Sequence, residues 1–233
     1  EPPRKFTWHY QDSVLDKSHK IADVSPVEFY RHHVPLQLTD YVCLVNDPRN
    51  EYEKLYTVKY LGNVSEGRPI RYLNLPVDQL RQLALASLRD NQTVWFGCDV
   101  MQNFDRKECA MDLKLANSAP LLGIAYGMNK TERLQYGESL MTHAMVLTGA
   151  RTESATDTVK NQTNLKVTHW QVENSWSDTG PAKGFYNMSD DWFTEYVFEV
   201  VVPRKLLSEQ QLESLKSESV TELPPWDPMG ALA

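Results

Sequence analysis

The chain of 233 residues is long enough for one large domain or most of two, and its 41% hydrophobic and 24% charged residues are ordinary for a globular protein with a real core. A net charge of −7 argues against nucleic acid as the main partner, because phosphate binding needs clustered lysine and arginine. No apolar run approaches the roughly 18 residues that span a bilayer, and no apolar core follows a basic start, so we predict neither a membrane span nor a signal peptide.

The cysteines indicate the compartment. Cys43, Cys98 and Cys109 are too few, and odd in number, for a disulfide framework, which favours a reducing environment. Asn-x-Ser/Thr sequons such as the one at Asn63 point the other way, but asparagine, serine and threonine also gather in turns and helix caps. We therefore expect a cytoplasmic protein.

Alternation, apolar stripes and capping residues outline the elements of the first hundred residues. In chain order they predict a strand at 6–10, a helix that begins at Ser25-Pro26 and stops before Pro35, strands at 41–45 and 55–64, a helix at 76–90 and a strand at 93–100. The abrupt start, without an initiating methionine or a cap, leads us to expect a cut within a longer protein.

Residues 101–128 carry weaker signals, and clearer patterns return after them. In chain order these predict a helix at 129–136, a strand from His143, an exposed loop at 150–165, a strand that ends at Asn174, a capped helical turn at 189–192, a strand at 197–202 and a helix at 208–217. The last stretch is rich in proline and has no periodicity. We therefore predict a single unit over 1–223 and an extended arm over 224–233, anchored by Trp226.

Two short strings within Gly137–Trp176 carry the chemistry. In the first, His143 opens a strand, and in the second, Asn174 closes a strand on its more apolar face. If these strands pair antiparallel, the two side chains meet at the same end of the ladder. A side-chain amide can hold an imidazole in one tautomer, and a buried Trp176 beside it would keep water off that hydrogen bond. This is the base-and-orienter half of a Cys-His-Asn protease site.

Three motifs in this chain are Thr142-His-Ala-Met, Val172-Glu-Asn-Ser-Trp and the closing Pro224-Pro-Trp-Asp-Pro-Met-Gly-Ala-Leu-Ala. Together they resemble one branch of the papain-like cysteine proteases, bleomycin hydrolase and the bacterial aminopeptidases C. The resemblance covers essentially the whole chain but maps onto the C-terminal half of the family's chain. It implies an α+β papain-like fold, of which this chain is the β-rich, His/Asn-bearing half with helical insertions.

The resemblance also implies a function, that of a cysteine aminopeptidase. In it His143 would be the catalytic base, Asn174 would orient the ring and Trp176 would shield the pair. The tail would run into the cleft, where the carboxylate of Ala233 would bind the free α-amine of a peptide substrate and block the cleft beyond it. A hexamer with its sites facing an inner chamber is implied as well, and neither a metal nor an organic cofactor is.

The nucleophile is the departure from the family pattern. Papain-like chemistry needs a cysteine at the N-terminus of a helix, in the first half of the enzyme. Cys98 lies in a predicted strand and too close to His143 in sequence. Cys43 also lies in a predicted strand and Cys109 in a polar stretch. We therefore predict that all three are inert, that the N-terminal half of the enzyme supplies the cysteine, and that this chain alone is inactive.

Other interpretations stay open. The missing nucleophile would also fit a catalytically silent papain-like interaction or scaffold domain, and a hydrolase that uses Cys98 is a weaker third option. Among the remaining histidines, His169 competes with His143 by spacing, but it lies on the polar face of its strand and is predicted to be a surface residue. No partner signal accompanies the other four, which are His9, His19, His32 and His33.

Overall fold

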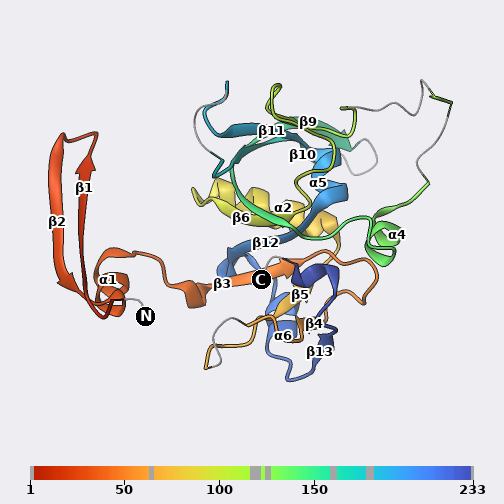
Figure 1. Cartoon of the computed structure of the whole chain (residues 1–233). Helices are drawn as coiled ribbons and strands as arrows, with labels where there is room; N and C mark the ends of the chain where they lie inside the picture. The colour runs from red at the N-terminus through yellow and green to blue at the C-terminus, as the bar shows by residue number, and fades with distance from the viewer. Residues whose placement is uncertain are drawn as a thin grey trace. The chain divides into compact units, whose positions relative to one another are not determined.

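Two units make up the chain, residues 1–39 and residues 40–233 (Figure 1). The computed structural model describes residues 3–62, 66–115, 122–123, 127–157, 162–176 and 181–231. The sequence shows no linker at the boundary between the units, and the division differs from the single unit predicted over 1–223.

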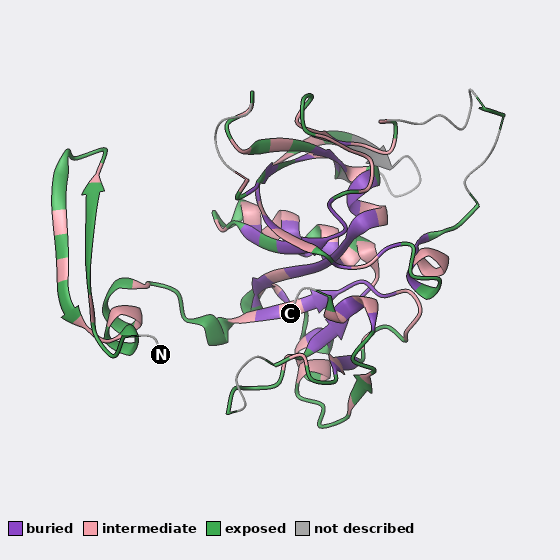
Figure 2. Cartoon of the chain, viewed as in Figure 1, coloured by how far each residue is buried: buried purple, intermediate pink, exposed green. Residues whose placement is uncertain are grey.

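The first unit is an antiparallel hairpin of β1 (Phe6–Asp12) and β2 (Lys17–Val24), followed by α1 (Pro26–His33). The capping box that the sequence predicts is present at the start of α1, where the backbone N–H of Ser25 donates to the Glu28 carboxylate over 2.8 Å. None of the described residues of this unit is buried (Figure 2).

The second unit is built on one mixed sheet. Across the sheet the strands are β13 (Val220–Leu223), β4 (Leu55–Val58), β5 (Tyr72–Asn74), β3 (Tyr41–Val45), β12 (Val197–Pro203), β6 (Val94–Cys98), β9 (His143–Asp157), β10 (Gln162–Glu173), β11 (Phe185–Ser189), β8 (Ala110–Met111) and β7 (Phe104–Asp105). The pairs β13–β4, β5–β3 and β11–β8 are parallel, and the other pairs are antiparallel.

Short helices complete the second unit. They are α2 (Val77–Arg89), α4 (Lys130–Gln135), α5 (Asp190–Tyr196) and α6 (Glu209–Leu215), with 3₁₀ turns η2 (Arg204–Leu206) and η3 (Pro228–Gly230), and a further turn η1 (Leu38–Asp40) lies at the unit boundary. The apolar stripe of α2, which includes Leu80 and Ala84, is buried and faces β6, β9 and β12. Helices and a mixed sheet together give the α+β class that the sequence predicts.

Buried side chains form two clusters. The larger one packs α2 and α5 against the sheet and draws on strands from β4 to β8, including Leu55 of β4, Leu44 of β3 and Met111 of β8. The smaller one joins β3, β4 and β5 to α4 and the tail, and consists of Val45, Tyr56, Val58, Tyr72, Leu134, Met141, Phe198 and Met229. The smaller cluster is where the tail is fixed to the sheet.

Three predicted elements need correction. The exposed loop predicted at 150–165 is wrong, because β9 extends to Asp157 and β10 begins at Gln162. The two strands supply each other's hydrogen bonds, and threonine-rich segments are compatible with strands when a partner is present. The strand predicted over 55–64 ends at Val58, and residues 63 and 64 of the predicted range lie outside the described residues. The helical turn predicted at 189–192 continues as α5 to Tyr196.

The prediction that Trp226 anchors the tail is also wrong. Trp226 is 81% exposed, whereas Met229 is 1% exposed and packs in the smaller cluster. The reason is local: the Asp227 carboxylate accepts the N–H of Met229 over 2.9 Å and starts the turn η3. This turn directs Met229 into the core and makes it the apolar anchor.

Candidate active site

The two residues predicted to form the site come together. His143 is the first residue of β9 and pairs with Cys98 of β6, and the N–H before it, of Thr142, donates to the Cys98 carbonyl over 3.0 Å. Asn174 follows β10 directly, and its N–H donates to the Gly184 carbonyl. His143 Nε2 and Asn174 Oδ1 lie 3.0 Å apart, at one end of the β9–β10 ladder.

Strand alternation explains why Asn174 reaches the interior. Trp170, Val172 and Asn174 are all buried, while Gln171 and Glu173 between them are exposed. The amide nitrogen of Asn174 is buried and has no hydrogen-bond partner among the described residues, so Oδ1 alone orients the side chain toward the ring. The predicted face of this strand is confirmed.

Trp176 lies against the imidazole. The ring centroids of His143 and Trp176 are 4.8 Å apart with an interplanar angle of 36°. Phe104 of β7 meets the indole edge-on, and the guanidinium carbon of Arg106 lies 4.4 Å from the centre of an indole ring. The indole therefore has an aromatic neighbour and a cation besides the histidine, and it is half-buried where the sequence analysis expects a buried residue.

No sequence pattern indicates the roles of Phe104 and Arg106, because both lie in the stretch 101–128 with weak periodicity. Arg106 stands two residues after Phe104, next to the very short strand β7, whose one pairing among the described residues is with the very short β8. Without a long alternating pattern, their approach to Trp176 could be found only from the folded chain.

The segment leading to His143 is held at several points. The backbone N–H groups of Glu138 and Ser139 donate to the Arg133 carbonyl, and the Ser139 hydroxyl donates to Asp99 over 2.8 Å. Ser139 is 1% exposed, so this hydrogen bond is screened from water. The N–H of Met141 donates to the Pro228 carbonyl of the tail over 3.2 Å. These contacts fix the backbone from which the imidazole projects.

This arrangement can perform proton transfer. An amide oxygen accepts but does not donate, so with Oδ1 facing the ring, Nε2 carries a hydrogen in either protonation state of His143. Nδ1 is then the atom left to take or give a proton. Among the described residues, the ring has no other hydrogen-bond partner.

The cysteines of this chain do not complete the site. Cys98 is fully buried, and burial, together with the adjacent Asp99, raises the pKa of its thiol well above the ordinary value. Burial, followed by the nearby Glu199, raises the pKa of Cys43 to about 12. A thiol that stays protonated is a poor nucleophile. Within the described part of the chain, no cysteine hydrogen-bonds to His143, and all three are free thiols.

Other residues singled out in the sequence lie elsewhere. Ala233 falls outside the described residues. His169 is half-buried on β10, opposite Arg151 of β9 and on the other face from Trp170, so it does not join His143. In the described ranges, no cluster of three histidine, cysteine or acidic side chains could hold a metal ion, and no helix is both long and apolar enough to cross a membrane.

Comparison with known proteins gives one consistent result. Residues 1–230 match the Peptidase C1-like family. The chain is 47% identical to bleomycin hydrolase of Homo sapiens and 38% identical to aminopeptidase C of Lactococcus lactis subsp. cremoris, in each case over its whole length. A crystal structure of PepW from Lactobacillus rhamnosis superposes with a TM-score of 0.89, at 40% identity, over all of this chain and 51% of that one.

The chain spans about half the length of these relatives, 50% of the human protein and 51% of the Lactococcus protein, and corresponds to their C-terminal half. The chain belongs to the Peptidase C1-like family, in the branch that contains bleomycin hydrolase and aminopeptidase C.

Proposed function

We propose that this chain is the C-terminal half of a cysteine aminopeptidase, in which His143 is the catalytic base and Asn174 its orienter. The observation that carries the proposal is the 3.0 Å contact between His143 Nε2 and Asn174 Oδ1 beneath Trp176. The N-terminal half of the protein supplies the cysteine, since burial raises the pKa of the Cys98 and Cys43 thiols and keeps them protonated. The three free thiols support a reducing, cytoplasmic compartment.

The proposed reaction uses Nδ1 of His143. The cysteine thiolate attacks the carbonyl carbon of the first peptide bond, while Nδ1–H of the imidazolium gives its proton to the leaving amine as the C–N bond breaks. Water then attacks the thioester, Nδ1 takes its proton, and the released thiolate regenerates the ion pair. Asn174 keeps the ring in one orientation throughout, and Trp176 limits the access of water to their hydrogen bond.

We further propose that the carboxylate of Ala233 binds the α-amine of the substrate, so that the enzyme removes residues from free N-termini. Support comes from the name of the relative from Lactococcus lactis, aminopeptidase C, and from the anchoring of the tail beside the approach to His143. A charge pair of this kind selects the ionised amine and excludes substrates that extend past it.

The test uses the complete protein, with its N-terminal half present, on an aminoacyl-aminomethylcoumarin with a free amine. His143→Ala is expected to lower kcat/KM by about 10³-fold or more, the range for loss of a general acid and base. His169→Ala is the matched control, because it removes a histidine from the same hairpin without touching Asn174. Its activity should stay within about twofold of the wild type.

Two outcomes would contradict the proposal. Turnover that survives His143→Ala would remove the histidine from the mechanism. A complete protein that shows no turnover sensitive to iodoacetamide would instead favour the silent interaction or scaffold domain.

The 233-residue chain by itself should show no turnover, because it lacks the proposed cysteine. Sedimentation of the complete protein would test the predicted hexamer.

A further inference from the structure

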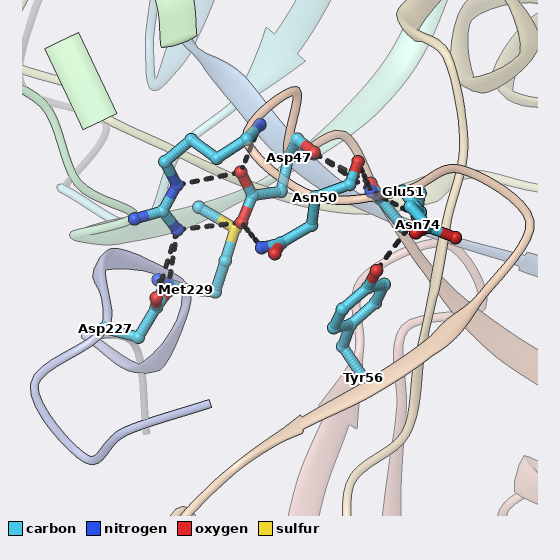
Figure 3. A network of polar contacts seen from close by, with 8 residues as sticks. Asp47, Asn50, Glu51, Tyr56, Asn74, Asp227 and Met229 are labelled. Atoms are coloured by element: carbon cyan, nitrogen blue, oxygen red, sulfur yellow. Dashed lines mark hydrogen bonds and ion pairs between the residues drawn. The ribbon is translucent and has the colours of Figure 1, made fainter. Parts of the chain in front are cut away.

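Arg49 binds two carboxylates that are far apart in the sequence. Its guanidinium donates to both oxygens of Asp47, over 2.9 and 2.7 Å, and Nη2 also donates to both oxygens of Asp227, over 2.9 and 3.1 Å (Figure 3). The side chains of Asp47 and Asp227 are only 3% and 8% exposed. This Asp47–Arg49–Asp227 clamp therefore works largely away from water, where charge-assisted hydrogen bonds are strong.

The loop on one side of the clamp is itself fixed. The N–H of Asp47 donates to Asn74 Oδ1, and Asn74 Nδ2 donates back to the Asp47 carbonyl, both over 2.9 Å. Asn74 is fully buried, and Asn50 Nδ2 adds a hydrogen bond to Asp47 Oδ2 over 2.8 Å (Figure 3). The guanidinium is thus held on a rigid platform at the end of β3 and not on a mobile loop.

The tail turn 227–230 is fixed on the other side. Met229 is buried in the smaller cluster, and a Cβ on Gly230 would lie 2.9 Å from a methyl of Val58, so the backbone is in close contact with β4. The Pro228 carbonyl accepts the N–H of Met141, which shares that cluster and precedes His143 by two residues. The turn is therefore tied both to the clamp and to the backbone that carries the candidate base.

We propose that Arg49 is a specificity-determining positioning residue, which fixes the point from which the last residues of the chain extend toward the substrate's amine. The proposal rests on the proposed function of the Ala233 carboxylate. Three residues after Gly230 extend by at most about 10 Å. A short arm with a fixed origin keeps its end near one place, whereas an arm released at Asp227 spreads over a larger volume and lowers the effective concentration of the carboxylate.

The test compares two substrates on the complete protein, a dipeptidyl-aminomethylcoumarin with a free amine and the same compound N-acetylated. In Arg49→Met, the ratio of kcat/KM for the free over the acetylated substrate should fall at least tenfold, mainly through a higher KM for the free amine. Arg49→Lys keeps a charge but not the fork that binds both carboxylates, so it should give an intermediate ratio.

Arg81→Met is the matched control. The Arg81 side chain is 18% exposed like that of Arg49, and it pairs with Asp190 over 2.8 Å, away from the tail. Its loss should destabilise the protein to a similar degree and leave the substrate ratio within about twofold of the wild type. A general effect of destabilisation is thereby separated from an effect on the tail.

The outcomes separate the two proposals. A wild-type protein without preference for the free amine would overturn the proposed role of the tail carboxylate. A wild-type preference that persists unchanged in Arg49→Met would overturn the role of Arg49 alone. If Arg49→Met does not fold, Asp227→Asn takes its place, because it keeps an acceptor for the Met229 N–H while removing the charge. It should lower the ratio in the same direction by at least threefold, and an unchanged ratio would overturn the role of the clamp.

Discussion

The His143–Asn174 pair and the Asp47–Arg49–Asp227 clamp hold distant parts of the chain together by different kinds of hydrogen bond, one to a neutral amide and the other between charged groups. The first joins residues 31 positions apart through a neutral acceptor and an aromatic neighbour. The second joins residues up to 178 positions apart through buried charges. In the described ranges, the first pair lies at one end of the β9–β10 ladder, and the clamp lies at the end of β3.

The difference matches what each contact has to do. A catalytic imidazole must gain and lose a proton, and a neutral amide orients the ring without strongly favouring the charged form, as a carboxylate would. A structural anchor should not titrate near neutral pH, and a guanidinium stays protonated throughout. The proposed catalytic histidine thus has a neutral partner, whereas the tail anchor has a permanently charged one.

Asn174→Ala removes the neutral partner of His143, and we expect it to have a larger effect than any change in the tail. The imidazole loses its only described hydrogen bond, so kcat/KM on a free-amine substrate should fall roughly 10²- to 10³-fold while the fold is kept. Steady-state kinetics and circular dichroism of the complete protein check both parts. Asn187→Ala on β11, an exposed asparagine, is the control. Full activity in Asn174→Ala would mean that packing by Trp176 alone orients the ring.

Met229→Ala removes the apolar contact that anchors the tail in the smaller cluster. Met229 is 1% exposed in the smaller cluster, and truncation of such a side chain costs about 3 kcal/mol of unfolding free energy. Urea titration of the purified protein measures the loss. Because Met141 packs in the same cluster, kcat should fall as well. A loss below about 1 kcal/mol would show that the clamp holds the turn without Met229.

Glu199 differs from the carboxylates of the clamp, because this buried acidic group has no cationic partner among the described residues. It is 4% exposed in β12, and burial raises its pKa to about 7, while a hydrogen bond with Cys43 lowers it by less. Between the ordinary value of 4.5 and about 7 the folded state holds the proton that the unfolded state releases. Stability should therefore fall as pH rises through this window and stay lower above it, by about 3 kcal/mol.

Glu199→Gln tests this directly. The variant should remove most of that slope and be more stable than the wild type at pH 8, with little difference at pH 4.5. Urea midpoints at a series of pH values between these limits give the measurement. Glu153→Gln on β9, where the side chain is 62% exposed, should leave the slope unchanged. A wild-type protein whose stability does not fall over this window would show that Glu199 is charged in the fold and paired.

The sequence was sufficient for features that depend on local patterns. The stripe of α2, the capping boxes of α1 and α4, and the alternation around Trp170 and Asn174 each have a period or a cap that can be read directly. The contact between His143 and Asn174 followed from one added assumption, that their two strands pair antiparallel. The His–Asn half of the candidate site could therefore be found without a structure.

Features that depend on long-range pairing could not be found this way. Nothing near Arg49 indicates Asp227, and the polar segment that became the end of the β9–β10 hairpin forms strands because each supplies the other's hydrogen bonds. The short β7 has no period to read, so Phe104 and Arg106 beside Trp176 were missed. In each case the deciding partner lies outside the sequence window in which a pattern can be recognised.

Trp226 gives the smallest expected effect and the clearest contrast with Met229. A large aromatic in a tail suggests an anchor, because its exposure to water is unfavourable. Yet the Asp227 turn places Met229 inward and leaves Trp226 81% exposed, so Trp226→Ala should change the free energy of unfolding, measured by urea titration, by less than about 0.5 kcal/mol. The same variant should leave the preference for a free amine unchanged, because it touches neither Arg49 nor the hydrogen bond from Met141 to Pro228. If Trp226→Ala instead lowered stability as much as Met229→Ala, another part of the complete protein would have to cover the indole, and the tail would have two apolar anchors.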